Sequence, residues 1–169
     1  MKKLFFLFSI TAILISSGSF AQLDNKFKFS VGVELGLATG NFSNGYSFGI
    51  GGTGQAEFSI QDKFRGTVTG GIVFYNGKSI GNGVKNTGLT VIPIRVGGKY
   101  YLTSSVYGAL QLGVGFLNKG LGAAFAYSPQ IGYEFLSKNN KPVDIAFKYD
   151  AYLKNGTLGS LGIRLALVL

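Results

Sequence analysis

Residues 27–38 read FKFSVGVELGLA, and apolar side chains alternate along this stretch with small or polar ones, without a break. The apolar positions are Phe27, Phe29, Val31, Val33, Leu35 and Leu37. The intervening positions are Lys28, Ser30, Gly32, Glu34, Gly36 and Ala38. Successive side chains of a β-strand point to opposite faces of the sheet, so this period of two indicates a strand with one oily face.

The same alternation recurs in seven later segments of the chain. These segments span residues 46–60, 64–75, 89–102, 106–116, 123–136, 143–150 and 160–169. Connections rich in Gly, Asn, Ser and Lys separate them. An even number of alternating segments about ten residues long is typical of a transmembrane barrel. The sequence therefore predicts an all-β fold, an eight-stranded antiparallel up-and-down transmembrane β-barrel.

The first residues have the three parts of a secretory signal peptide. Lys2 and Lys3 precede an apolar stretch at 4–15, and Ser19-Phe20-Ala21 fits a small-x-small cleavage site. The stretch is shorter than the roughly 20 apolar residues of a helical span. We therefore expect residues 1–21 to be cleaved as a signal peptide and residues 22–169 to form one outer-membrane β-barrel domain. Because the chain has no cysteine, we expect neither a lipid anchor on cysteine nor a disulfide.

The composition favours a membrane barrel over a water-soluble protein. Hydrophobic residues make up 46% of the chain and charged residues 14%, which suits a water-facing surface badly. Without the leader, 14 basic and 7 acidic residues remain. A basic balance can indicate nucleic-acid binding, but these bases are spread singly and an exported protein meets no genome. No run of 18 apolar residues follows the leader, so a closed barrel is the remaining membrane structure.

Three features predict that the apolar face points outward to lipid. Many residues of the other face are glycines, which suit a crowded interior better than a hydrated surface. Most charges share that face. Outward aromatic residues would form two belts around an aliphatic band, as at the two interfaces of a bilayer. They are Phe27, Phe29, Phe58, Tyr100, Tyr133 and Phe135 at one end, and Tyr46, Phe48, Phe74, Phe116, Phe125 and Tyr149 at the other. The alternative is the inverse arrangement, a secreted soluble lipocalin-like barrel whose oily face lines a ligand cavity.

Charged residues of both signs occupy the inward positions of the predicted strands. They are Lys28, Glu34, Glu57, Arg65, Arg95, Lys99, Glu134, Asp144, Lys148, Asp150 and Arg164. A buried charge needs an opposite partner. We therefore expect an ion-pair network that fills the barrel interior.

The outer loops are predicted to carry only positive charge. If odd-numbered strands rise from the periplasm, the external connections are 39–45, 76–87, 118–122 and 153–158. They contain four basic residues and no acid: Lys78, Lys85, Lys119 and Lys154. Such a rim could attract anionic lipid headgroups or surface polysaccharide. Plain solvation is the favoured interpretation, because isolated lysines on loops form no defined site.

The sequence offers little for catalysis. It has no histidine, the usual proton acceptor near neutral pH, and neither His nor Cys to hold zinc or copper. Residues 49–54 match G-x-G-x-x-G, but the dinucleotide fingerprint requires a strand-to-helix turn, whereas this match lies within a strand. A carboxylate pair such as Glu34 with Asp150 is conceivable as an enzyme site, although inward charges are far more often structural. We expect no enzymatic activity, cofactor or metal.

The chain resembles the outer-membrane β-barrel domain family, within the broad group of small OmpA-like and OmpX-like eight-stranded proteins. The resemblance spans residues 27–169 and is clearest at IPIRVGGKYYL (92–102), LGVGF (112–116) and YSPQIGYEF (127–135). These motifs imply the fold, outer-membrane lipid as the surroundings, and the barrel-assembly machinery as a partner during insertion. Family members usually end in an aromatic residue, whereas this chain ends LALVL.

Eight strands enclose only enough space for their own side chains, which disfavours a diffusion pore. The sequence therefore predicts a non-enzymatic integral outer-membrane protein with a structural or surface-interaction role. The alternatives are an envelope assembly component or lipid- or partner-binding barrel and, less favoured, a narrow channel.

Overall fold

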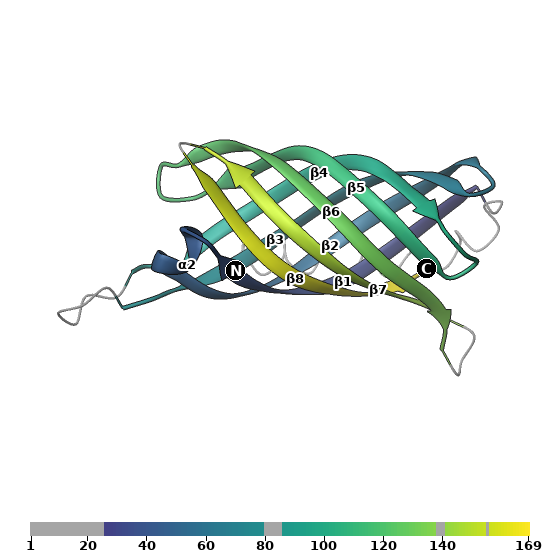
Figure 1. Ribbon diagram of the computed structural model, residues 1–169, viewed down its shortest axis with the longest axis horizontal. Helices are drawn as coiled ribbons and strands as arrows, with labels where there is room; N and C mark the ends of the chain where they lie inside the picture. Colours follow the sequence, from purple (N-terminus) through teal and green to yellow (C-terminus); the bar gives the residue numbers. More distant parts are fainter. Residues whose placement is uncertain (1–25, 80–85, 138–140, 155) are drawn as a thin grey trace, which may run out of the picture.

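The computed structural model describes residues 26–79, 86–137, 141–154 and 156–169 of the protein. In these residues the chain forms a barrel of eight β-strands and a one-turn helix (Figure 1). The elements are β1 (Phe27–Thr39), α2 (Phe42–Gly45), β2 (Tyr46–Gln61), β3 (Phe64–Gly77), β4 (Leu89–Tyr101), β5 (Val106–Leu117), β6 (Gly122–Leu136), β7 (Pro142–Leu153) and β8 (Thr157–Val168). The predicted signal peptide lies outside the described residues.

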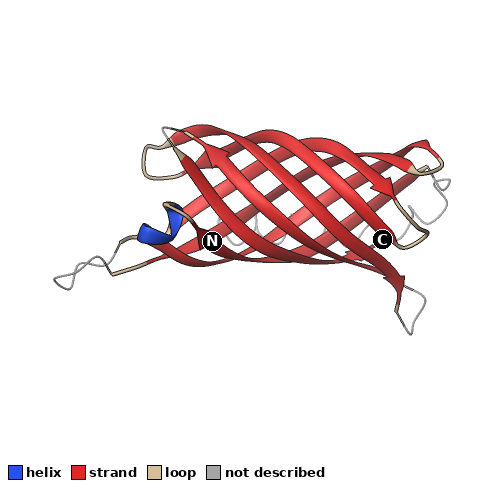
Figure 2. Cartoon of the chain, in the orientation of Figure 1, coloured by secondary structure: helices blue, strands red, loops and turns tan. Residues whose placement is uncertain are grey.

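Each strand pairs antiparallel with its neighbours in sequence, and β1 also pairs with β8. This last pairing closes the sheet, so the barrel has no free edge. The helix α2 lies at one end, which we call the α2 end, and the C-terminus lies at the other, the C-terminal end (Figures 1 and 2). The predicted fold class and strand order are confirmed: this is an eight-stranded up-and-down barrel of the transmembrane kind.

The register keeps the two faces of the sheet separate around the barrel. Leu35 of β1 lies opposite Ile50 of β2 and Ile163 of β8, and all three are exposed. The preceding residue, Glu34, lies opposite Gly51 and Arg164, and it is buried. The continuous alternation in the sequence therefore corresponds to an apolar outer wall and a charged inner wall.

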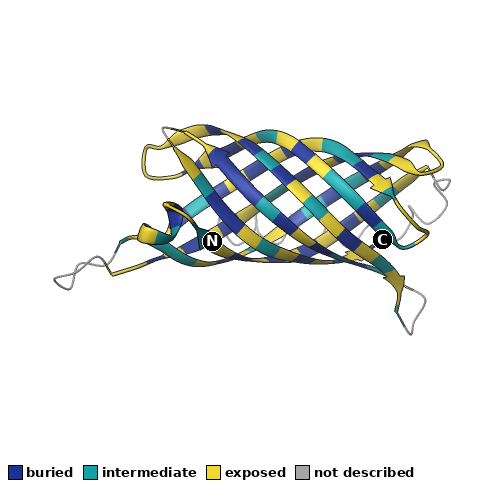
Figure 3. Cartoon of the chain, in the orientation of Figure 1, coloured by how far each residue is buried: buried dark blue, intermediate teal, exposed yellow. Residues whose placement is uncertain are grey.

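The outer wall is an apolar surface that extends over every strand, and exposed positions alternate with buried ones (Figure 3). Val33, Ile94 and Ile131 are each more than half exposed, as residues that face lipid should be. A soluble lipocalin-like barrel needs the opposite arrangement, so this orientation contradicts that alternative. Among the described residues, no helix has the length and apolar character needed to cross a membrane.

Two details at the α2 end differ from the prediction. The first outer connection contains the helical turn α2, whose Phe42 is buried. Tyr46, expected in the outer aromatic belt, is half-buried, and its ring lies 5.0 Å from that of Phe42. The pairing of β2 with β3 shifts register between Tyr46 and Gly49. This irregularity breaks the period-two rule, so Tyr46 packs against the apolar cluster at the barrel mouth.

Candidate functional site

The inner wall is the first candidate site, because five of the seven acidic residues and six of the sixteen basic ones lie there. Glu34, Glu57, Arg95, Lys99, Asp144, Lys148, Asp150 and Arg164 are buried, and Lys28, Arg65 and Glu134 are half-buried. Alternation alone therefore located the charged positions. The period-two alternation could not show which charges form pairs, because the partners come from strands that are far apart in sequence.

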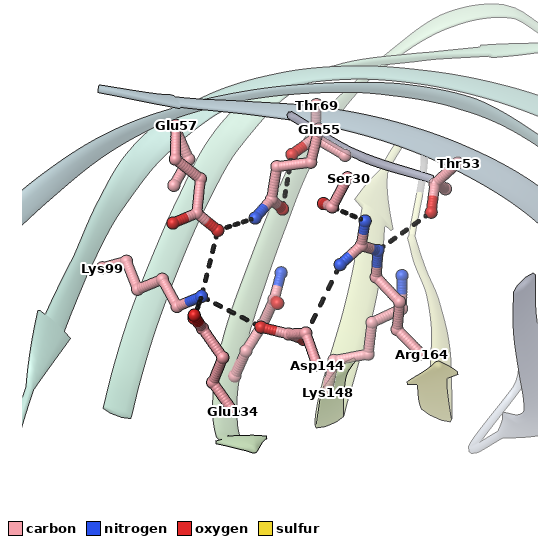
Figure 4. A network of polar contacts seen from close by, with 12 residues as sticks. Ser30, Thr53, Gln55, Glu57, Thr69, Lys99, Glu134, Asp144, Lys148 and Arg164 are labelled. Carbon is pink, nitrogen blue, oxygen red and sulfur yellow. Dashed lines mark hydrogen bonds and ion pairs between the residues drawn. The ribbon is translucent and has the colours of Figure 1, made fainter. Parts of the chain in front are cut away.

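Lys99 forms the centre of the cluster nearer the C-terminal end. Its ammonium lies 3.0 Å from a Glu57 oxygen, 2.9 Å from Asp144 and 3.4 Å from Glu134 (Figure 4). Lys28 pairs with the other Glu134 oxygen at 2.5 Å. These five residues are called the Lys99 cluster below. Its carboxylates come from β2, β6 and β7, so one ammonium from β4 ties four strands together across the lumen.

Tyrosine hydroxyls complete this cluster. Tyr107 donates a hydrogen bond to Asp144 at 2.8 Å, and Tyr101 donates one to Glu134 at 2.6 Å. The Lys99 ammonium also lies 3.8 Å from the centre of the Tyr107 ring, close enough for a cation–π contact. Asp144 and Glu134 therefore each have a cation and a hydroxyl donor, and Glu57 accepts from Lys99 and from the Gln55 amide at 2.8 Å. These contacts compensate for the water that the carboxylates lose on folding.

A second cluster lies nearer the α2 end and consists of Glu34, Arg95, Lys148 and Asp150, called the Arg95 cluster. Arg95 pairs with one Asp150 oxygen, and Lys148 lies 2.9 Å from the other. Lys148 also lies 2.6 Å from Glu34. Two acids and two bases make this cluster neutral, which is what a low-dielectric interior requires of buried charge.

Arg164 and a set of amide and hydroxyl side chains lie between the clusters. Arg164 donates to Thr53 at 3.0 Å and to Ser30 at 2.9 Å, and its guanidinium lies 3.7 Å from Asp144 (Figure 4). Gln111 donates to Thr69 at 2.8 Å and to Gln55 at 3.1 Å. The middle of the lumen is thus filled by bonded polar side chains.

An apolar plug closes the α2 end, and sequence reasoning missed it. It comprises the buried residues Phe42, Val73, Tyr75, Leu89, Val91, Leu117, Ala124, Ala126 and Tyr152. Phe42 from α2 covers it, with its ring 5.0 Å from that of Tyr75 in an edge-on contact. The sequence does contain a sign of the plug: the inward positions at these ends of β3 and β4 hold apolar residues, namely Val73, Tyr75, Leu89 and Val91.

The predicted basic rim is the second candidate site. Lys78, Lys119 and Lys154 are exposed on the connections at the α2 end, whereas Lys85 lies outside the described residues. Lys78 donates to the Ser43 carbonyl at 2.8 Å, and Lys119 donates to the Thr87 carbonyl. The ammonium of Lys119 also lies 5.3 Å from the Tyr46 ring centre. Two of these lysines therefore connect neighbouring loops as well as carrying charge.

We expect the variant Lys119→Met to loosen the outer loops without unfolding the barrel. The substitution removes the bond from the β5–β6 connection to Thr87, so limited proteolysis of the purified barrel should cleave these loops several-fold faster. Lys154→Met is the matched control: it removes the same charge, but among the described residues its side chain has no hydrogen bond to another loop. Equal cleavage rates for the two variants would contradict the loop-tying role of Lys119.

The charged side chains of the lumen are engaged mainly with one another. Its carboxylates are engaged by cations and hydroxyls, and the apolar plug and side-chain layers separate them from the α2 end. Among the described residues, no group of three or more Asp or Glu side chains is placed to hold a metal ion. The arrangement neutralises charge and cross-links the strands.

Comparisons with known proteins support the fold class. No protein-family model matches the chain, and no curated protein matches it.

Solved structures do share the fold. The outer-membrane protein Ail of Yersinia pestis, in a phospholipid bilayer nanodisc, is 12% identical, with 85% of this chain and 99% of Ail covered and a TM-score of 0.58. Neisserial surface protein A is 16% identical, with 84% and 94% covered and a TM-score of 0.57. The de novo designed TMB2.3 is 18% identical, with 84% and 94% covered and a TM-score of 0.51. The chain is thus similar in fold to small eight-stranded transmembrane barrels, both natural and designed.

Proposed function

We propose that the protein is a non-enzymatic integral protein of the bacterial outer membrane with a structural or surface-interaction role. The apolar outer wall supports insertion in a bilayer, the predicted signal peptide supports export, and the natural structural neighbours named above are outer-membrane and surface proteins. Insertion would require the barrel-assembly machinery, and membrane lipid would surround the finished barrel.

The closed lumen is the single observation that carries this proposal. From the C-terminal end to the α2 end, the interior holds the Lys99 cluster, the amide layer, the Arg95 cluster and the apolar plug. A barrel that fills its own interior has its lipid-facing wall and its loops left for interaction. The function therefore depends on the outer surface.

Fractionation and gel mobility test the location. The full chain expressed in a Gram-negative host should be found in the outer membrane and lack residues 1–21. Its unheated and boiled forms should migrate differently, as membrane barrels do. Protein released in water-soluble form without detergent, or one with no heat-dependent shift, would overturn the proposal.

We expect the reconstituted protein to give no steady single-channel current in planar bilayers. Opening a path would require the ion pairs of both clusters to separate and Phe42 to leave the plug, and breaking buried ion pairs costs several kcal/mol. The narrow channel is the alternative function, and reproducible conductance steps from pure, folded protein would establish it.

A further inference from the structure

An apolar groove of about 700 Å³ lies on the lipid-facing wall. It crosses the outer faces of β6, β7, β8 and β1 and reaches β2. Its walls include Leu37, Phe48, Ile131, Phe147, Tyr149 and Ile163. The lining is predominantly apolar, which suits an apolar ligand.

The wall beneath the groove is interrupted at Pro129 of β6. The ladder between β6 and β7 runs from Phe125 to Tyr127, stops, and resumes at Gln130, which lies opposite Lys148. Proline has no N–H, so Pro129 cannot donate to the strand residue opposite it, Tyr149. Prolines are rare inside sheets without an edge. Pro129 therefore places a break in the β6–β7 ladder at the wall of the groove.

Positive charge lies beyond the α2 end of the groove. The groove ends at the paired residues Leu37 and Phe48, and Phe48 follows Gly45 of α2 by three residues, about 10 Å of extended chain. The backbone N–H of Lys78 donates to the Gly45 carbonyl at 2.9 Å, so its ammonium is anchored at this end. An ammonium carries three donors, and the bond to Ser43 uses one of them. The connections at this end contain no acid.

Tyr149 marks the transition from apolar groove to polar rim. It follows Phe147 by two residues toward the α2 end, and it is half-buried. Tyrosines concentrate where a membrane protein passes from hydrocarbon to headgroups, because the ring is apolar and the hydroxyl polar. The groove thus spans the depth at which a lipid acyl chain meets its headgroup.

We propose that this groove binds an acyl chain of an anionic, phosphate-bearing membrane lipid, with the lipid phosphate at Lys78. The inference rests on the proposed membrane location and adds a specific lipid site to it. An apolar lining continuous with the lipid-facing wall selects hydrocarbon, and the basic rim without acids selects a negative headgroup over a neutral one.

Native mass spectrometry of the delipidated full barrel in mild detergent tests the site. Phosphatidylglycerol and phosphatidylcholine with identical chains are the two probes. The variant Ile163→Trp fills the groove, and Ile94→Trp makes the same change on an outward position of β4 outside it. Lys78→Gln removes the rim charge, and Lys141→Gln removes one at the C-terminal end. The heat-dependent gel shift shows that each variant is folded.

The parent barrel should retain phosphatidylglycerol more tightly than phosphatidylcholine. Ile163→Trp should weaken retention of both lipids about tenfold while Ile94→Trp leaves it unchanged. Lys78→Gln should weaken the retention of phosphatidylglycerol about fivefold and leave that of phosphatidylcholine unchanged. About fivefold is the factor expected for one lysine near an anionic headgroup. Lysine variants that bind alike would overturn the headgroup contact.

Equal retention by the two tryptophan variants would overturn the site, as would a dimer of this chain that Ile163→Trp alone dissociates. If the parent protein lacks the gel shift, the membrane location fails instead, so the two failures are distinguishable.

Discussion

Replacing Lys99 by methionine is expected to lower the free energy of unfolding by about 3–5 kcal/mol, the cost of breaking a buried ion pair by removing one partner. Lys99 is buried and faces Glu57, Asp144 and Glu134. Methionine fills similar space but leaves three carboxylates close together, and Glu57 loses its cation. Urea titration in detergent micelles, followed by the gel shift because the chain has no tryptophan, measures the change.

Lys28→Met is the matched control within the same cluster. The Lys28 side chain is 29% exposed, and its partner Glu134 keeps Lys99 and Tyr101 when Lys28 is lost. A partly exposed pair contributes about 1 kcal/mol or less, so Lys28→Met should be mild. Adding Glu57→Gln to Lys99→Met should recover part of the loss, because the two sites are coupled. Lys28→Met and Lys99→Met variants of equal stability would contradict the central role of Lys99.

The prediction from sequence succeeded wherever the period of two is strict. The alternation predicts a strand over residues 27–38 with Glu34 inward and Leu35 outward, and in the structure Glu34 is buried and Leu35 exposed. The ends of the strands were predicted to within a few residues, since turn-forming residues mark them. Alternation fixes these features because each depends on neighbours along one strand.

Contacts across the lumen could not be predicted in the same way. Lys99 contacts Asp144 because β4 and β7 face each other across the lumen. No local sequence pattern encodes a contact between strands that are not neighbours in the sheet. The apolar plug could not be predicted for a different reason. Phe42 lies in a connection that reads as a turn, and only its burial against Tyr75 shows that the loop folds back over the barrel mouth. The register shift before Gly49 likewise turned Tyr46 away from its expected face.

Replacing Gly113 by alanine is expected to destabilise the barrel by about 3 kcal/mol, at the upper end for overpacking a close-packed site. A Cβ added at Gly113 would lie 2.1 Å from the carbonyl oxygen of Ile94 and 2.7 Å from the Cα of Arg95. Both atoms belong to the backbone of β4, so relief requires β4 and β5 to move apart. Such a movement would also disturb Arg95, which holds Asp150 across the lumen.

The same strand supplies the controls for this prediction. At Gly108 a Cβ meets nothing within 4 Å, so Gly108→Ala should be neutral or stabilising by less than about 1 kcal/mol, because alanine restricts the unfolded chain. At Gly115 a Cβ would lie 2.5 Å from the Tyr152 ring, so a side chain rather than backbone must move, and Gly115→Ala should fall between the two. Urea titration of the three variants should therefore give the order Gly108→Ala, Gly115→Ala, Gly113→Ala from most to least stable. Three equal values would mean that β4 and β5 are not held at the close separation on which the inner-wall geometry depends.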